Sequence, residues 1–362
     1  MRNSLAFLTG LLLLFPVSSQ EFRLALPGYH YEFPRDHFSH PDFQTEWWYY
    51  TGNVRAAGGH RFGFELTFFR QALDRNPSKT SVWDVRDLYL AHLALSDLDA
   101  RGFYYAERLN RSGPGIAGVR QNDGRIWNGN WRIDWKGNEQ TLQAIDNRFT
   151  IELDLRAEKP PIIHGENGVS QKAEGPGRAS HYFSLTRLAA KGQITLGGKP
   201  FEVSGLAWMD HEFFTHQLDA DQAGWDWLSV QLEDDTELML FRIRRKDGSI
   251  DPYSSGTFID AQGRSMHLRD SDFVLRPLND RWKSKATNAD YPIHWRITIP
   301  KLRMDFEIQT SLPSQELTGG SRLAPNYWEG SVQINGRKGE APLAGVGYLE
   351  MTGYDRPVEM GR

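Results

Sequence analysis

The densest group of residues able to carry chemistry lies between residues 208 and 227, where acidic and aromatic side chains alternate. A carboxyl group beside large apolar rings loses hydration, which raises its pKa and can keep it protonated near neutral pH. Such an acid could protonate an alkene or a leaving oxygen while a neighbouring carboxylate or histidine activates water. The candidate catalytic residues are therefore Asp210, His211, Glu212 and Asp226, set among Trp208, Phe213, Phe214, Trp225 and Trp227.

A structural interpretation competes with this one. Asp210 and Glu212 could cap turns and the tryptophans could fill a core, because structural ion pairs also perturb carboxyl groups. His92 and His181 are single histidines in apolar segments, where a histidine more often completes a core than catalyses a reaction. A weaker cluster of acids and aromatic residues lies near the C-terminus and comprises Glu316, Tyr327, Trp328, Glu329, Tyr348, Glu350 and Tyr354.

Three familiar motifs fail on inspection. The segment 113–118 has the spacing of a dinucleotide-binding loop, but Pro114 interrupts it and 122–124 would stop a following helix. His211 and His216 are five positions apart, so they cannot share a helix face as zinc ligands in the His-Glu-x-x-His motif do. No Gly-x-Ser-x-Gly nucleophile elbow occurs. No spacing supports a metal site, and we expect no metal and no cofactor.

The elements that position these residues are predicted to be strands. Phe62, Phe64, Leu66 and Phe68 fall on one side of a segment with a period of two, which is typical of a β-strand. The segment 88–95 is apolar on both faces, so we expect a strand covered on both sides. A hairpin is predicted from 225–232 to 237–244 around a polar turn. The fold class is therefore all-β, a sandwich or barrels.

The chain length favours two β domains. The 362 residues exceed one β unit of about 150–200 residues, so we predict a first domain at 20–215 and a second at 216–362. Residues 1–19 are predicted to be a cleaved signal peptide, with Arg2 before an apolar run that is too short to span a membrane. A buried N-terminal helix is the alternative. We expect an exported, periplasmic or secreted protein with no membrane span after cleavage.

Composition narrows the functional classes further. Lys and Arg number 42 and Asp and Glu number 46, giving a net charge of -4, so a dedicated nucleic-acid binder is not expected. The chain has no cysteine, which excludes disulfides, thiolate metal sites, a cysteine nucleophile and a lipidated cysteine. Its 12 Trp, 13 Tyr and 20 Phe favour β structure and an apolar or stacking ligand.

Eight ordered blocks of residues resemble one family. They are 46–52 (Glu-Trp-Trp-Tyr and Gly52), 91–97, 181–188, 205–213 (with Trp-Met-Asp-His-Glu), 224–227, 315–317, 327–330 and 347–354. Together they resemble the superfamily of carotenoid 1,2-hydratase (hydroxyneurosporene synthase) and AttH, whose members are lipocalin-like and are often labelled secreted hydrolases. The resemblance runs in order from about residue 40 to residue 355.

This resemblance implies two tandem lipocalin-like β-barrel domains. For the carotenoid hydratases it implies addition of water to a terminal isoprenoid double bond without a redox cofactor. Carried onto this sequence, Asp210 is the acid and His211 the water-activating partner, while Trp225 and Trp227 could stabilise a cation. The expected ligand-binding residues are Trp47, Tyr49, His92, Trp208, Trp225, Trp227, Trp328 and Tyr348.

Two functional hypotheses stand at this point. The first is a cofactor-independent hydratase or hydrolase of an apolar, isoprenoid- or lipid-like small molecule. The second is a non-catalytic periplasmic carrier of such a molecule, because members of the AttH branch are associated with ABC export systems. The absence of a recognised catalytic motif supports the carrier, whereas the acid cluster supports the enzyme.

Overall fold

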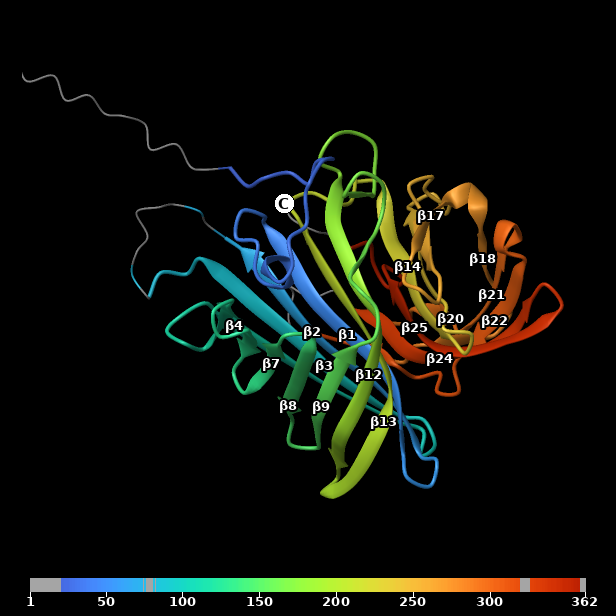
Figure 1. Ribbon diagram of the computed structural model, residues 1–362, viewed down its shortest axis with the longest axis horizontal. Coiled ribbons are helices and arrows are strands. Elements are labelled where there is room, and N and C mark those ends of the chain that lie inside the picture. Colours follow the sequence, from blue (N-terminus) through green and yellow to red (C-terminus); the bar gives the residue numbers. More distant parts are fainter. Residues whose placement is uncertain (1–20, 74, 76–80, 82, 320–325, 359–362) are drawn as a thin grey trace, which may run out of the picture.

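The polypeptide is all-β and is built on two large antiparallel sheets (Figure 1). A computed structural model describes residues 21–73, 75, 81, 83–319 and 326–358, so the predicted signal peptide, 1–19, lies outside the described residues. Within these ranges the helical elements are the short 3-10 turns η1 (Arg35–His37), η2 (Asp270–Asp272) and η3 (Pro300–Leu302). No helix of the described ranges is long and apolar enough to cross a bilayer.

The first sheet has 13 strands, with the path β4-β3-β2-β1-β13-β12-β9-β8-β7-β6-β5, and β10 and β11 pair with β12. Its strands are β1 (Thr45–Ala56), β2 (Arg61–Ala72), β3 (Asp87–Asp97), β4 (Gly102–Arg111), β5 (Ala117–Arg120), β6 (Arg125–Asn128), β7 (Trp131–Lys136), β8 (Glu139–Ile145), β9 (Phe149–Ala157), β10 (Ile162–Ile163), β11 (Ser170–Gln171), β12 (Ala179–Leu196) and β13 (Lys199–Phe214).

The second sheet has 10 strands, with the path β17-β16-β15-β14-β25-β24-β22-β21-β18, and β23 pairs with β24. Its strands are β14 (Gln222–Leu232), β15 (Glu237–Arg245), β16 (Ser255–Ile259), β17 (Ser265–Arg269), β18 (Val274–Pro277), β21 (His294–Ile299), β22 (Met304–Gln309), β23 (Glu316–Leu317), β24 (Tyr327–Lys338) and β25 (Ala341–Thr352); β19 (Arg281–Lys283) and β20 (Asp290–Pro292) form a separate ribbon. The predicted hairpin is confirmed as β14 and β15. The predicted domain boundary falls in the connection between β13 and β14.

Each sheet curls around its own apolar core. The period of two in β2 places Phe62, Phe64, Leu66 and Phe68 in the first core, as predicted. Fully burying one such side chain contributes about 2 kcal/mol. The two ends of the first sheet approach one another. The Asn128 side chain on β6, near one end, donates to the Tyr89 carbonyl oxygen on β3, near the other end, at 3.0 Å. A second core fills the curl of the second sheet and includes Leu228, Leu240, Trp295, Ile297, Phe306 and Ile334.

The two sheets pack against each other through the outer faces of β1, β2, β24 and β25. At this contact the Asn53 amide donates to the Gly347 carbonyl oxygen at 3.1 Å. Gly63 makes the close approach possible, since a Cβ there would lie 2.9 Å from the Ser331 Cβ. The central strands of the first sheet are therefore covered on both faces, and alternate side chains on them enter a barrel core or the space between the sheets.

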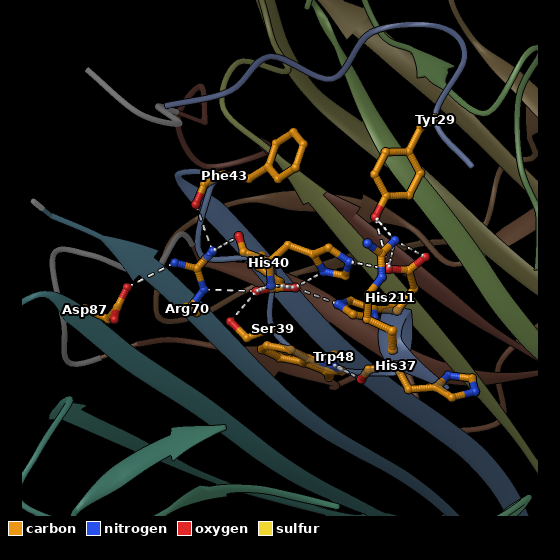
Figure 2. Close-up of polar contacts among 12 residues, drawn as sticks. Tyr29, His37, Ser39, His40, Phe43, Trp48, Arg70, Asp87 and His211 are labelled. Atoms are coloured by element: carbon orange, nitrogen blue, oxygen red, sulfur yellow. Dashed lines mark hydrogen bonds and ion pairs between the residues drawn. The ribbon is translucent and has the colours of Figure 1, made fainter. Parts of the chain in front are cut away.

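The segment before β1 is fastened to the first barrel by a buried charged network (Figure 2). The Glu46 carboxylate accepts hydrogen bonds from Arg70 Nε at 2.9 Å, His40 Nδ1 at 2.7 Å and His211 Nε2 at 2.9 Å. His40 also contacts the Asp36 carboxylate through Nε2 at 2.9 Å. Burial alone would raise the pKa of Glu46, but Arg70, His211 and His40 hold it well below its usual value.

We predict that Glu46→Gln lowers the free energy of unfolding by about 3 kcal/mol, because it leaves the buried Arg70 without its nearest counter-charge. Urea unfolding followed by tryptophan fluorescence measures the change. Asp154→Asn is the matched control, since Asp154 is exposed on β9 and should change stability by less than about 0.5 kcal/mol. Equal stability of the Glu46→Gln variant and the wild type would contradict the prediction.

Candidate functional site

A cavity of about 560 Å³ lies between the two sheets. Its volume falls within the range of small-molecule sites. Strands from both halves of the chain contribute to its wall, so neither barrel alone would form it. The aromatic part of the lining consists of Trp47, Tyr49, Phe69, Tyr182, Trp225, Trp227, Phe241 and Tyr327, and the carboxyl groups are those of Glu65, Asp210, Glu212 and Glu350.

Asp210 lies on β13 with its side chain facing the cavity, and only 4% of its surface is exposed. Its Oδ2 accepts a hydrogen bond from the Tyr182 hydroxyl at 2.6 Å. Its Oδ1 accepts from Trp208 Nε1 at 2.6 Å and from the Ser184 hydroxyl. Burial raises the pKa of Asp210 to about 7, although these three hydrogen bonds oppose the rise. The group therefore exchanges a proton in the neutral range.

Glu212 is the next residue of β13 on the same face. It accepts hydrogen bonds from the Ser180 hydroxyl and from Gln217 Nε2, the latter at 2.8 Å, and Lys172 Nζ lies 3.5 Å away. Burial lowers the pKa of Lys172, and Glu212 opposes that change. Residues two apart in a strand lie about 6.5–7 Å apart. The carboxyl groups of Asp210 and Glu212 can therefore flank a ligand or a water molecule.

Two further carboxyl groups, those of Glu65 and Glu350, line another part of the cavity. Glu65 Oε1 accepts from the Tyr327 hydroxyl at 2.9 Å, and burial raises the pKa of Glu65. His92 Nδ1 lies 2.5 Å from the same Tyr327 hydroxyl. Burial also raises the pKa of Glu350, to about 8, against the effect of a hydrogen bond from Trp225. At neutral pH the protonated Glu350 can donate a hydrogen bond to an uncharged ligand.

A second tyrosine–glutamate pair crosses between the sheets beside the first. Tyr49 on β1 donates to Glu329 Oε1 on β24 at 2.5 Å. Burial, with Glu65 nearby, raises the pKa of Glu329 well above its usual value. Glu329 itself is fully buried and stands behind Tyr49, which lines the cavity.

Two predicted catalytic residues point away from the cavity. His211 is fully buried on the opposite face of β13, where it contacts Glu46 in the first barrel (Figure 2). Asp226 is buried on the opposite face of β14, where Arg242 donates to it at 2.7 Å and Tyr354 at 2.8 Å. The period of two along both strands explains this: neighbours of Asp210 and Trp225 in sequence face the other way.

The predicted ligand-binding residues divide into two groups. The cavity lining contains Trp47, Tyr49, His92, Trp225 and Trp227. The other three stand outside it. Trp208 is buried behind Asp210, Trp328 packs in the second core with Nε1 donating to the Pro313 carbonyl oxygen at 2.7 Å, and Tyr348 is buried where the sheets meet.

Reasoning from the sequence missed Glu65, Tyr182 and Lys172 among the cavity residues. Glu65 had a visible signal, because it is an acid in the middle of β2, on the face opposite the four alternating apolar residues. Tyr182 lies in 181–188, one of the eight blocks that resemble the family, but no local sequence pattern marks it as a cavity residue. Lys172 follows β11 directly and has no sequence signal; the pairing of β11 with β12, which itself pairs with β13, brings it to Glu212.

His40, Glu46 and His211 form the group of side chains that could offer ligand atoms to a metal ion, all within 4.8 Å of one another. In the structure these atoms are hydrogen-bonded to each other, and Arg70 donates to the same carboxylate. An adjacent guanidinium repels a metal cation, so the arrangement fits the structural network better than a metal centre.

The fold and the cavity together define a class: tandem lipocalin-like β-barrels with a cavity between them. The AttH-like family model matches residues 24–354, so the chain belongs to the AttH-like family. A solved protein from Nitrosomonas europaea assigned to AttH is 32% identical, with 92% of this chain and 100% of that chain covered and a TM-score of 0.82. The predicted resemblance and the predicted fold class are confirmed.

A more distant structural neighbour shares the fold, and one curated protein is similar in sequence. Kievitone hydratase from Nectria haematococca is 15% identical, with 94% of this chain and 99% of that chain covered and a TM-score of 0.69. The dehydratase asqC of Emericella nidulans is 23% identical over 217 residues, which are 58% of this chain. The chain spans 60% of the length of that curated relative.

We predict that Asp210→Asn removes a pH-dependent loss of stability. Folding raises the pKa of Asp210 from 3.8 to about 7, so between these values the folded chain holds a proton that the unfolded chain has released. The wild type should therefore lose stability as the pH rises through this range, whereas asparagine does not titrate. Relative to the wild type, the variant should gain on the order of 4 kcal/mol between about pH 4 and pH 8.

Urea unfolding at several pH values measures this difference. Asp154→Asn, on an exposed strand position, serves as the control that should show no comparable trend. A difference between Asp210→Asn and wild type that stays constant across the pH range would show that Asp210 is ionised in the folded protein.

Proposed function

We propose that this protein is a hydratase or dehydratase that adds water to, or removes it from, an apolar small molecule held between the two barrels. The observation that carries the proposal is Asp210, a buried carboxyl group on the wall of an aromatic cavity, with a pKa raised to about 7. The ideal pKa of a general acid lies near the working pH. Adding water to a double bond changes no net oxidation state, so no redox cofactor is required.

The side chains around the cavity suit each stage of that reaction. Asp210 supplies a proton to the double bond, and the faces of Trp225 and Trp227 stabilise the positive charge that develops. Glu212 lies on the same wall beside Lys172 and is the residue placed to accept a proton from the attacking water. His211 takes no part, because it faces the interior of the first barrel.

Names given to relatives support this choice of reaction. The fungal protein with the same fold is a hydratase, and the curated relative is a dehydratase. We further propose an isoprenoid- or lipid-like ligand, because the lining combines aromatic rings with the Glu350 carboxyl group, whose pKa burial raises to about 8.

A periplasmic carrier, associated with an ABC exporter, is the alternative proposal. The enclosed aromatic cavity favours it equally, since a carrier needs binding without turnover. Export itself is proposed from residues 1–19, and it predicts a mature chain that begins at Gln20. Intact-mass measurement of protein taken from the periplasm tests this, and an uncleaved chain in the cytoplasm would contradict it.

We predict that Asp210→Asn lowers the rate of hydration by a factor of about 10²–10⁴ and leaves ligand affinity nearly unchanged. Asparagine keeps the shape of the carboxyl group but has no acidic proton. The assay uses whichever ligand co-purifies with the protein, and farnesol as a defined isoprenoid alkene, in water of heavy oxygen. Mass spectrometry then detects the incorporated oxygen, and tryptophan fluorescence reports binding.

Asp154→Asn should retain wild-type turnover. Tight binding of a co-purified ligand with no oxygen incorporation by the wild type would favour the carrier. Full activity of Asp210→Asn would show that the acid lies elsewhere in the cavity.

A further inference from the structure

The two oxygens of the Asp210 carboxyl group have unequal surroundings. Oδ1 receives the indole N–H of Trp208, which can only donate, so Oδ1 must act as an acceptor whatever the protonation state. A protonated carboxyl oxygen is a poor acceptor. The proton of a neutral Asp210 therefore resides on Oδ2, whose hydrogen-bond partner is the Tyr182 hydroxyl at 2.6 Å.

A buried chain of side chains reinforces this assignment. Ser184 donates to Asp210 Oδ1 and lies 2.6 Å from His164 Nε2, while His164 Nδ1 lies 2.8 Å from the Thr257 hydroxyl. Burial lowers the pKa of His164 well below its usual value, so the ring is neutral. With Thr257 donating to Nδ1, the Nε2 proton points to Ser184 and the Ser184 proton points to Oδ1.

The hydrogen-bond partners of the Tyr182 oxygen fix the direction of its proton in the same way. Trp227 Nε1, another group that can only donate, lies 3.0 Å from it. When Asp210 Oδ2 carries its proton and donates it to Tyr182, the Tyr182 oxygen accepts two hydrogen bonds. The phenol proton must then point elsewhere, and Tyr182 lines the cavity. Burial beside Asp210 raises the pKa of Tyr182 well above its usual value, so the phenol keeps a proton throughout.

Building on the proposed function, we infer that Tyr182 is a catalytic residue that hands the Asp210 proton to the ligand. The Tyr182 O–H bond breaks as its proton forms a new bond to the ligand carbon, and the Asp210 proton moves from Oδ2 to the Tyr182 oxygen. The electron pair of the double bond forms the new C–H bond and leaves a ligand cation, which water captures while Glu212 takes the proton of that water. The protein is left with a neutral Tyr182, a protonated Glu212 and an Asp210 carboxylate that accepts three hydrogen bonds, from Tyr182, Trp208 and Ser184. One proton then returns from Glu212 to Asp210 before the next turnover. In dehydration the same steps run in reverse.

The orientation of the Tyr182 hydroxyl can be tested without turnover. The probe is geranylacetone, an isoprenoid ketone isotope-labelled at its carbonyl carbon, and infrared spectroscopy reads its carbonyl frequency. At about pH 5, where Asp210 is protonated, a hydrogen bond from Tyr182 should lower the frequency in the wild type. The shift should be lost in Tyr182→Phe and should persist in Tyr50→Phe, which removes another buried phenol hydroxyl on β1, bonded to Gln140 at 2.6 Å in the first barrel.

Raising the pH supplies a second test on the wild type, which does not depend on the folding of a variant. As Asp210 ionises, the Tyr182 hydroxyl turns back to Oδ2, and the carbonyl shift should disappear. The other titratable groups that face Tyr182 and Asp210 are Glu212, Lys172, Glu350, His164 and Glu329. The carbonyl shift of Asp210→Asn should therefore stay constant with pH, which separates the titration of Asp210 from theirs. An unshifted carbonyl in the wild type, or a shift that survives in Tyr182→Phe, overturns the inference.

Kinetics separates this inference from the proposed function. In the heavy-oxygen assay with farnesol, Tyr182→Phe should lower kcat by about 100-fold or more with little change in KM, while Tyr50→Phe stays near wild type. Loss of activity in Asp210→Asn but not in Tyr182→Phe rejects Tyr182 as the donor and leaves the hydratase intact. No turnover by the wild type rejects the hydratase and, with it, the role assigned to Tyr182.

Discussion

Burial of the Asp210 carboxyl group is the constraint on which the rest of the site depends. The charged form loses its hydration between two sheets, and among the described residues no cation contacts the group directly, so its pKa rises to about 7. Hydrogen bonds from Tyr182, Trp208 and Ser184 partly offset the free-energy cost of burying the Asp210 carboxyl group. A proton is thereby stored beside an apolar cavity, where the same carboxyl group in water would have released it.

This burial requires both barrels. Each sheet buries one face in its own core, and the remaining faces of β1, β2, β12 and β13 are covered only because β14, β15, β24 and β25 pack against them. The polar groups trapped between the sheets must then be satisfied across the interface, as in the pairs Tyr49–Glu329 and Tyr327–Glu65. Cohesion of the two halves and the chemistry of the cavity rest on the same side chains.

The separation of roles along β13 shows how local geometry divides function. Asp210 and Glu212 face the cavity, whereas His211 between them joins the Glu46 network that fastens the N-terminal segment. Three adjacent polar residues, equally attractive as catalytic groups in the sequence, thus serve two different purposes. One network holds the barrel together, and the other exposes a protonatable group to a ligand.

The sequence by itself determined the all-β class, the β2 strand, the β14–β15 hairpin and the family resemblance. It also identified Asp210 as a candidate acid. These features could be predicted because alternation of apolar residues and clustering of acidic and aromatic residues are local properties of the sequence. It could not rank Asp210 above His211 or Asp226, nor reveal Glu65, Tyr182 and Lys172 as cavity residues. Those assignments depend on which face of each strand meets the second sheet and on the burial that results. Only the tertiary structure decides them, because desolvation and hydrogen-bond partners come from residues distant in the chain.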